Sequence, residues 1–122
     1  MLGKELIQEM TVLESQTAEN IGSGSLPVLA TPALIAFMEN TAMKLLSDLP
    51  QDKTSVGTLI SAQHLKASAI GEKITCTAKI TEIEERKYIF YLEATDSSGV
   101  IIGKGTHERF VVNIEKFMSK LG

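Results

Sequence analysis

The residue of this sequence best placed for chemistry is a carboxylic acid on an apolar helix face. The apolar spacing predicts a helix from Pro32 to about Ser47, and at roughly 100° per residue Glu39 falls on its apolar side. The neighbours on that side are Ile35, Ala36, Ala42, Met43 and Leu46. No base lies three or four residues from Glu39, so a local ion pair does not explain the acid. Glu39 either faces solvent or needs a donor or cation from elsewhere in the fold.

A histidine and a threonine could join Glu39. His64 has the strand parity of Ile60 and Ala62, and also of Val56 and Thr58, which predicts that it points to the face covered by the helix. It is either a satisfied core histidine or half of a pair with Glu39 that moves protons near neutral pH.

Thr31 stands where the helix is expected to open. Before Pro32 it reads as an N-cap, with the proline at the first helical position. A hydroxyl there also lies where the free amides and the macrodipole of a helix favour the negative charge of an oxyanion. Both interpretations are kept.

Composition bounds the class of protein. We expect residues 1–122 to form a single domain with an ordinary core. A net charge of -3, from 12 basic and 15 acidic residues that are scattered along the chain, argues against nucleic acid as a partner. No stretch has the length of a signal peptide or a membrane span, so we expect a cytoplasmic protein with no membrane partner. The lone Cys76 cannot form an internal disulfide.

The rest of the pattern predicts mainly strands. A first strand is expected from Leu6 to about Ser15, a flexible loop at residues 22–25, and a helix end near Leu49 and Pro50. Four strands then follow, at about residues 55–66, 72–84, 87–96 and 100–112, and Asn113 can cap a short terminal helix. Short connections make neighbouring strands antiparallel, so the sequence predicts an α+β fold in which a curved sheet wraps one long helix.

Two glycines share one face of the last strand with two polar residues. Gly103, Gly105, His107 and Arg109 have the same parity. The glycines indicate either a bend in a curved sheet or the close approach of another backbone or a ligand.

Three segments together resemble the fluoroacetyl-coenzyme A thioesterase family of hotdog-fold proteins. They are Leu29-Ala-Thr-Pro-Ala-Leu-Ile-Ala-Phe-Met-Glu39, Val56-Gly-Thr-Leu-Ile-Ser-Ala-Gln-His64, and Gly103-Lys-Gly-Thr-His-Glu-Arg109 with Glu115-Lys-Phe117. The spacing is specific, since the threonine precedes the glutamate by eight positions and the glycine precedes the histidine by seven.

The resemblance implies a hotdog fold, a homodimer or higher oligomer with active sites at the subunit interface, and hydrolysis of thioesters. It makes Thr31, Glu39 and His64 the candidate catalytic residues. The candidate substrate-binding residues are Gly57, Pro32, Phe37, His107 and Arg109. Pro32 departs from the glycine of the fluoroacetyl-specific enzyme and has no N–H, so an oxyanion donor must come from a later amide or a side chain.

The predicted function is therefore hydrolysis of a small acyl-CoA thioester to free acid and CoA. Thr31, Glu39 or an activated water could be the nucleophile, with His64 as general acid and base. No cofactor is needed, and no residues have convincing metal-ligand spacing. The alternatives are a hotdog enoyl-CoA hydratase or dehydratase, and a non-catalytic acyl-CoA-binding protein.

Overall fold

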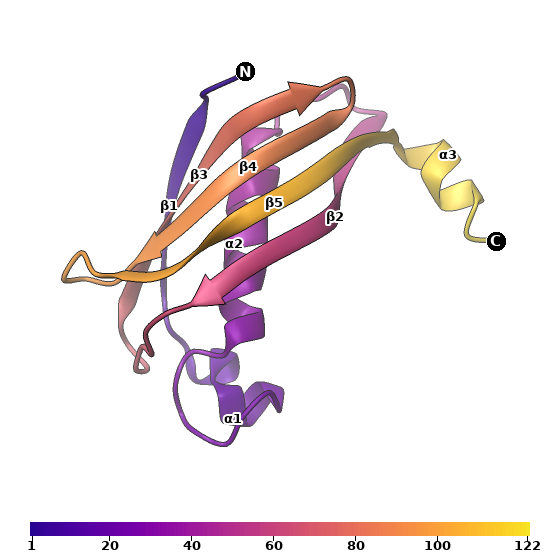
Figure 1. Cartoon of the computed structure of the whole chain (residues 1–122). Helices are drawn as coiled ribbons and strands as arrows, with labels where there is room; N and C mark the ends of the chain where they lie inside the picture. The colour runs from indigo at the N-terminus through magenta and orange to yellow at the C-terminus, as the bar shows by residue number, and fades with distance from the viewer.

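A computed structural model describes all 122 residues, with one long helix lying across a five-stranded antiparallel sheet (Figure 1). The strands are β1 (Glu5–Thr11), β2 (Lys53–His64), β3 (Lys73–Glu84), β4 (Lys87–Thr95) and β5 (Ile101–Asn113). The helices are η1 (Glu14–Gln16, 3-10), α1 (Ala18–Ile21), α2 (Thr31–Leu45) and α3 (Ile114–Ser119). The predicted α+β class is confirmed.

The strand order β1-β3-β4-β5-β2 leaves β2 at an open edge of the sheet. Tight turns join β3 to β4 and β4 to β5, whereas β1 and β2 lie at opposite edges, so the chain passes along α2 between them. The outer side of β2 has no strand partner within the chain, and its backbone groups can pair with another strand.

Most predicted boundaries agree with the structure. The four strands after the helix are confirmed to within two residues. The predicted first strand is too long, because the chain leaves the sheet after Thr11 and turns into η1 and α1, which the sequence analysis did not predict. The cap of α3 is confirmed, since Asn113 Oδ1 accepts a hydrogen bond from the Lys116 amide at 3.0 Å.

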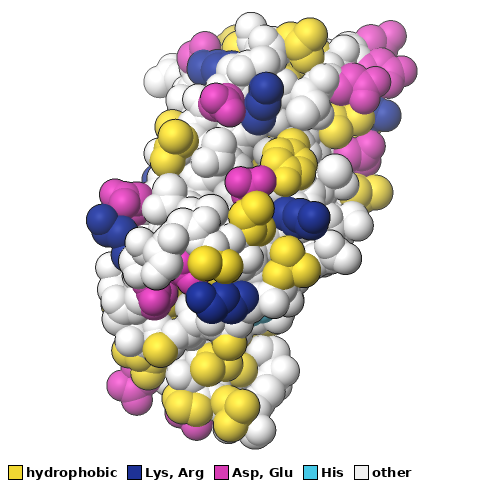
Figure 2. Space-filling model, turned by 60° about the vertical axis from the view of Figure 1, so that its left-hand side comes forward, with side chains coloured by type: hydrophobic (Ala, Val, Ile, Leu, Met, Phe, Trp, Pro, Cys, Tyr) yellow, Lys and Arg dark blue, Asp and Glu magenta, His cyan; other side chains and the backbone are white.

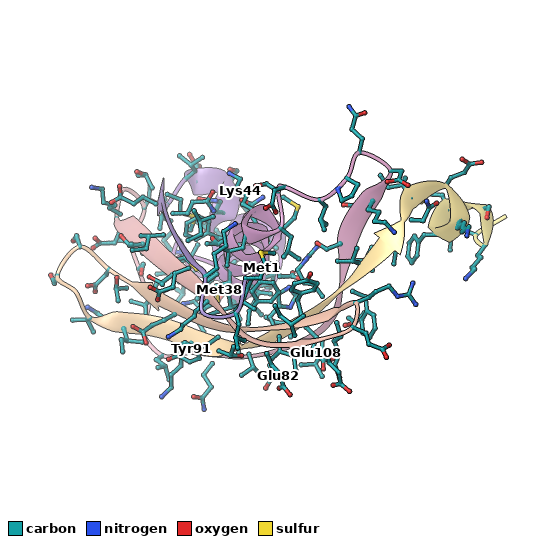
Figure 3. The ribbon with its side chains drawn as sticks, turned by 90° about the horizontal axis from the view of Figure 1, so that it is seen from above. Met1, Met38, Lys44, Glu82, Tyr91 and Glu108 are labelled. Atoms are coloured by element: carbon teal, nitrogen blue, oxygen red, sulfur yellow. The ribbon has the colours of Figure 1, made fainter.

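Helix α2 packs on the sheet through Leu34, Met38, Ala42 and Leu45, which recur at helical spacing and are buried. In Figure 3 Met38 lies between helix and sheet, whereas Tyr91, Glu82 and Glu108 project from the opposite face. The prediction that Glu39 occupies the middle of the buried face is therefore wrong. Glu39 lies on the flank of that stripe, and 37% of its side chain is exposed.

A β-bulge in β2 corrects the predicted parity of that strand. Gly57 pairs with Arg109 and Leu59 with Glu108, which leaves Thr58 as the extra residue. Ser55 and Gly57 therefore share the helix-facing side with His64, whereas Val56 does not. The odd spacing between Gly57 and His64 is compatible with one face only because of this bulge.

The two glycines of β5 mark close approaches. A Cβ on Gly103 would lie 2.9 Å from Leu34 Cδ2, so this glycine admits α2. A Cβ on Gly105 would overlap the Ser61 carbonyl oxygen and lie 2.7 Å from Ala62 Cα. Of the two alternatives, a bend in the sheet or a close approach, the second applies at Gly105, where the backbone of β2 lies close.

Charged side chains are mixed on the surface. On the face shown in Figure 2, lysine and arginine side chains stand singly among acidic and apolar ones. None of the helices combines the length and apolar character that crossing a bilayer requires.

Replacing Gly105 with alanine should destabilise the fold. The added methyl group meets backbone atoms of β2 that cannot move without breaking the β2–β5 ladder, and such overpacking costs about 1–3 kcal/mol. Urea unfolding followed by circular dichroism measures the change, with Thr106→Ala, at an exposed neighbour, as the control. Equal stability of the two variants would contradict the close approach.

Candidate active site

Thr31 and His64 form a direct pair at the amino end of α2. Thr31 Oγ1 lies 2.8 Å from His64 Nδ1. A hydroxyl in contact with an imidazole nitrogen is an arrangement that can transfer a proton between the two. The structure thus brings together two of the three predicted catalytic residues.

Thr31 is free for this contact because it does not cap the helix. Ala30 occupies the cap position, Thr31 is the first helical residue and Pro32 the second, and no side chain caps α2. The predicted N-cap role of Thr31 is therefore wrong by one position. The amides of Thr31 and Ala33 make no backbone hydrogen bond. Because Pro32 has no N–H, the first amide after it that could bind an oxyanion is that of Ala33.

The environment of His64 favours a neutral ring. Burial lowers the pKa of His64, and the nearby backbone of Lys66 opposes this effect. His64 Nε2 is enclosed by the chain and makes no hydrogen bond. A neutral imidazole can accept a proton near neutral pH, as a general base must.

Glu39 lies in a second cluster, around Gly57. A Cβ at Gly57 would lie 3.1 Å from Glu39 Oε2, 3.3 Å from His107 Cε1 and 3.4 Å from Arg109 Nη1. Glycine at this position therefore leaves the space that the carboxylate occupies. Arg109 is a cation from elsewhere in the fold that lies near Glu39, but the two make no ion pair within 4.0 Å, and Glu39 keeps part of its side chain in solvent.

Arg109 is held rigidly under the helix. Its Nε donates to Ser55 Oγ at 2.8 Å and its Nη2 to the Ser55 carbonyl at 3.0 Å. Its Nη1 donates to His107 Nε2 at 3.2 Å. Burial lowers the pKa of Arg109 and Glu39 opposes this, but a guanidinium remains charged in such a site.

The hydrogen bonds of His107 define its tautomer. Its Nδ1 lies 2.7 Å from the Leu59 carbonyl, which can only accept, so Nδ1 carries the proton. Nε2 then presents a lone pair to Arg109 and lies 4.0 Å from Glu39 Oε2. Burial lowers the pKa of His107, and the positive charge of Arg109 lowers it further. The Leu59 carbonyl and the charges of Glu39 and Glu108 raise this pKa, but by less. His107 and Glu39 are therefore not an ion pair.

The two clusters do not meet within one chain. Thr31 and Glu39 are eight residues apart on one helix, which at about 1.5 Å per residue separates them by about 12 Å. Of the remaining predicted substrate-binding residues, Pro32 is exposed on the flank of α2 that carries Glu39. Phe37 is placed elsewhere, because it lies about 200° around the helix from Glu39 and packs against the core.

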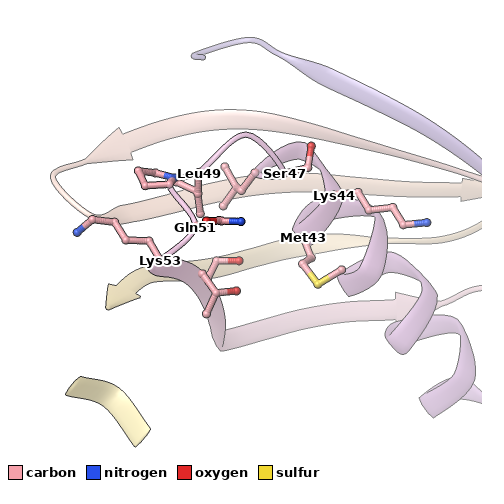
Figure 4. A pocket seen from close by; sticks show the side chains of 10 residues that line it. Met43, Lys44, Ser47, Leu49, Gln51 and Lys53 are labelled. Atoms are coloured by element: carbon pink, nitrogen blue, oxygen red, sulfur yellow. The ribbon is translucent and has the colours of Figure 1, made fainter. Parts of the chain in front are cut away.

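No hollow of the single chain encloses the candidate catalytic residues. One of about 280 Å³ lies where α2 ends and β2 begins, lined partly by Met43, Ser47 and Lys53 (Figure 4). It reaches Ser55, which binds Arg109, but not Thr31, Glu39 or His64. The structure also has no group of three or more His, Cys, Asp or Glu side chains that could hold a metal ion.

Two supporting groups were missed by the sequence analysis. Ser55 holds Arg109, and the Leu59 carbonyl fixes His107. Ser55 was assigned the wrong strand face because the bulge at Thr58 shifts the parity, and a backbone carbonyl leaves no signal in a sequence.

Comparisons with known proteins agree with this fold and these residues. The model of the family described as fluoroacetyl-CoA-specific thioesterase matches residues 12–115. The fluoroacetyl-CoA thioesterase of Streptantibioticus cattleyicolor is 34% identical over 95 residues, which cover 77% of this chain and 68% of the relative.

Solved structures give the same result. A mutant of the fluoroacetyl-CoA-specific thioesterase, in complex with fluoroacetate and CoA, superposes with a TM-score of 0.90 at 27% identity, covering 96% of this chain and 98% of the other. A thioesterase superfamily member from Thermus thermophilus reaches a TM-score of 0.89 at 25% identity, covering 99% and 92%. The fold is that of the hotdog thioesterases. The chain belongs to the fluoroacetyl-CoA-specific thioesterase family within that class, and it is a thioesterase.

Stability should fall as the solution is acidified below about pH 6.5. The pKa values of His64 and His107 are lower in the folded than in the unfolded protein, so the unfolded state takes up protons first as the pH falls. Each imidazole then removes up to about 1.4 kcal/mol per pH unit, between about 6.5 and its folded-state pKa.

Urea unfolding at about pH 7 and about pH 5 measures this loss. His64→Gln should reduce the pH dependence, because one of the two imidazoles is absent, while His107 retains its share. A free energy of unfolding that does not change between the two pH values would contradict the neutral, buried state of these rings.

Proposed function

We propose that this protein hydrolyses small acyl-CoA thioesters to free acid and CoA, as a homodimer whose two active sites each use Thr31 and His64 of one subunit and Glu39 of the other. The observation that carries the proposal is the Thr31–His64 contact at 2.8 Å, which puts an acid–base pair at the amino end of α2. The family membership supports the reaction class, and coenzyme A in the solved complex supports the substrate class.

Several features favour a second subunit. The open edge of β2 can pair with its own copy, which is the simplest way to satisfy an exposed strand edge. The flank of α2 that carries Glu39 also exposes Pro32, Ala36 and Met43, which are apolar or small residues. A partner subunit on this side would bury both the strand edge and the flank.

The strand register of such a dimer follows from the residues that must meet. Antiparallel pairing of two β2 strands about a two-fold axis at Ser61, with Thr58 left out of the ladder as the bulge residue, places His64 of one subunit opposite Gly57 of the other. Both residues face the helix layer, and neighbouring strands lie about 4.8 Å apart. Because Gly57 adjoins Glu39, the carboxylate of one subunit comes next to the Thr31–His64 pair of the other.

The assembled site has a part for each step of thioester hydrolysis. The thioester carbonyl lies at the amino end of α2, where the free amides of Thr31 and Ala33 favour the developing oxyanion. In the route in which water attacks the carbonyl, neutral His64 takes up the proton of that water through Thr31 and returns it to the departing CoA thiolate, which leaves free acid and CoA. Glu39 of the other subunit, which lies near Gly57 as Arg109 does, is the carboxylate that activates this water or, in the alternative route, attacks the carbonyl itself.

For the acyl group of the substrate, we propose only that it is small. The side chains of His107 and Arg109 fill the space next to Gly57 and Glu39, which limits the room beside the carboxylate. Pro32 differs from the glycine of the fluoroacetyl-specific enzyme, so the preference for fluoroacetyl-CoA is not carried over. We also propose a cytoplasmic location, which the single buried Cys76 supports.

His64→Ala should lower kcat for short acyl-CoA esters by about 100-fold or more, because the proton carrier is lost. Release of free thiol, followed with a chromogenic disulfide reagent over esters of graded length, measures the activity. The buried Cys76 does not interfere, since burial raises its pKa to about 11.

The control for this variant is Gln63→Ala, at an exposed neighbour in the same strand. Circular dichroism and sedimentation must show the fold and the dimer retained in both variants. Unchanged turnover in His64→Ala would exclude His64 as the proton carrier. Saturable acyl-CoA binding without thiol release by the native protein would indicate a binding module, and interconversion of enoyl esters without thiol release would indicate a hydratase.

A further inference from the structure

The carboxyl-terminal helix α3 and the turn after it expose several apolar side chains. Ile114, Phe117 and Met118 recur at the spacing of one helix face, Leu121 follows in the turn after the helix, and the four are 37% to 70% exposed. The opposite face carries Lys116. An amphipathic helix with its apolar side in water normally packs on another surface.

Helix α3 projects beyond the open edge of β2. In Figure 1 it continues from the end of β5 past β2, and in Figure 3 it lies clear of the sheet, level with the layer of α2. Its base is fixed to the first residues of β2, because Asn113 pairs with Lys53 and the Ile114 amide donates to the Asp52 carbonyl at 2.9 Å. The position of α3 relative to the β2 edge is therefore determined by the ladder.

The register of the proposed dimer identifies what faces α3, and the inference rests on that proposed function. With the two-fold axis at Ser61, Lys53 at the start of one β2 strand lies beyond His64 at the end of the other, where the partner's chain continues as residues 65–70. Helix α3, which starts beside Lys53, then faces the segment 65–70 that follows His64 of the partner subunit.

That segment offers an apolar surface. Leu65 and Ile70 are exposed, and so is Leu26 in the loop that lies against the segment, with exposed fractions of 48% to 63%. The loop is attached to the segment by the Leu29 amide, which donates to the Ser68 carbonyl at 2.9 Å. A contact between α3 and this surface would remove the apolar side chains of both from water, and this burial is the driving force for the contact.

We infer that α3 packs across the two-fold axis on Leu65, Ile70 and Leu26 of a second copy of this chain. The contact forms a wall beside the Thr31–His64 pair of that second copy, since Leu65 directly follows His64. Each active site is therefore bordered by the α3 helix of the opposite subunit, which narrows the opening of the site on that side.

Engineered disulfide formation tests this contact. The double variant Leu65→Cys with Met118→Cys should form a disulfide between subunits under mild oxidation, seen as a covalent dimer on non-reducing electrophoresis that reductant removes. The native Cys76 is fully buried and does not compete. The matched control is Leu65→Cys with Lys116→Cys, in which the second cysteine lies on the polar face of α3, and the single variants serve as further controls.

Sedimentation of the unmodified protein separates the possible failures. A monomer would overturn both the proposed shared active site and the α3 contact. A dimer in which the Leu65 and Met118 cysteines crosslink no faster than the control pair would overturn the α3 contact alone and leave the shared site standing. A dimer with rapid, selective crosslinking is the expected result.

Discussion

The geometry of α2 is the constraint on which the active site depends. A helix advances about 1.5 Å per residue, so a threonine and a glutamate eight positions apart lie about 12 Å apart along its axis. No rotation of the side chains joins them at one thioester carbon. His64 contacts Thr31, and Glu39 lies in another cluster, so a site that uses all three must take the acid from a second chain.

The β2 strand connects the two halves of that site. Its bulge at Thr58 puts Gly57 and His64 on the same face, and its open edge is available for pairing. Gly57 adjoins Glu39 within the chain, and in the proposed dimer the two-fold axis brings His64 of the other subunit opposite it. A substitution that removed the bulge would turn His64 away from the helix layer, because one residue of register reverses a strand face.

The buried Arg109, which lies near Glu39, has a structural role. A charge taken out of water must be hydrogen-bonded, and Ser55 and His107 provide three acceptors for its guanidinium. His107 can accept because the Leu59 carbonyl holds its proton on Nδ1. The guanidinium is thereby fixed below Glu39, and the neutral imidazole adds no second positive charge.

Much of this fold could be predicted from the chain, because period-two and helical patterns mark the strands and α2 directly. The strand face of Ser55 could not be predicted, because the bulge at Thr58 arises from the pairing of β2 with β5. The only trace of this bulge in the sequence is the neighbouring Gly57. The position of Thr31 was misjudged because Thr-Pro usually marks a cap, whereas here the hydroxyl bonds His64. Thr31, Glu39 and His64 could be named as candidates from the sequence, but the separation of Glu39 from the Thr31–His64 pair depends on distances that only the folded helix sets.

The most direct measurement of the shared site is complementation between two inactive variants, Glu39→Gln and His64→Ala. In a mixed dimer, one site combines His64 of the first chain with Glu39 of the second and is intact, while the other site lacks both. After unfolding and refolding together in equal amounts, half of the dimers are mixed, so about 25% of the native thiol release should return. A mixture of dimers that stays as inactive as its two components would contradict an active site shared between subunits.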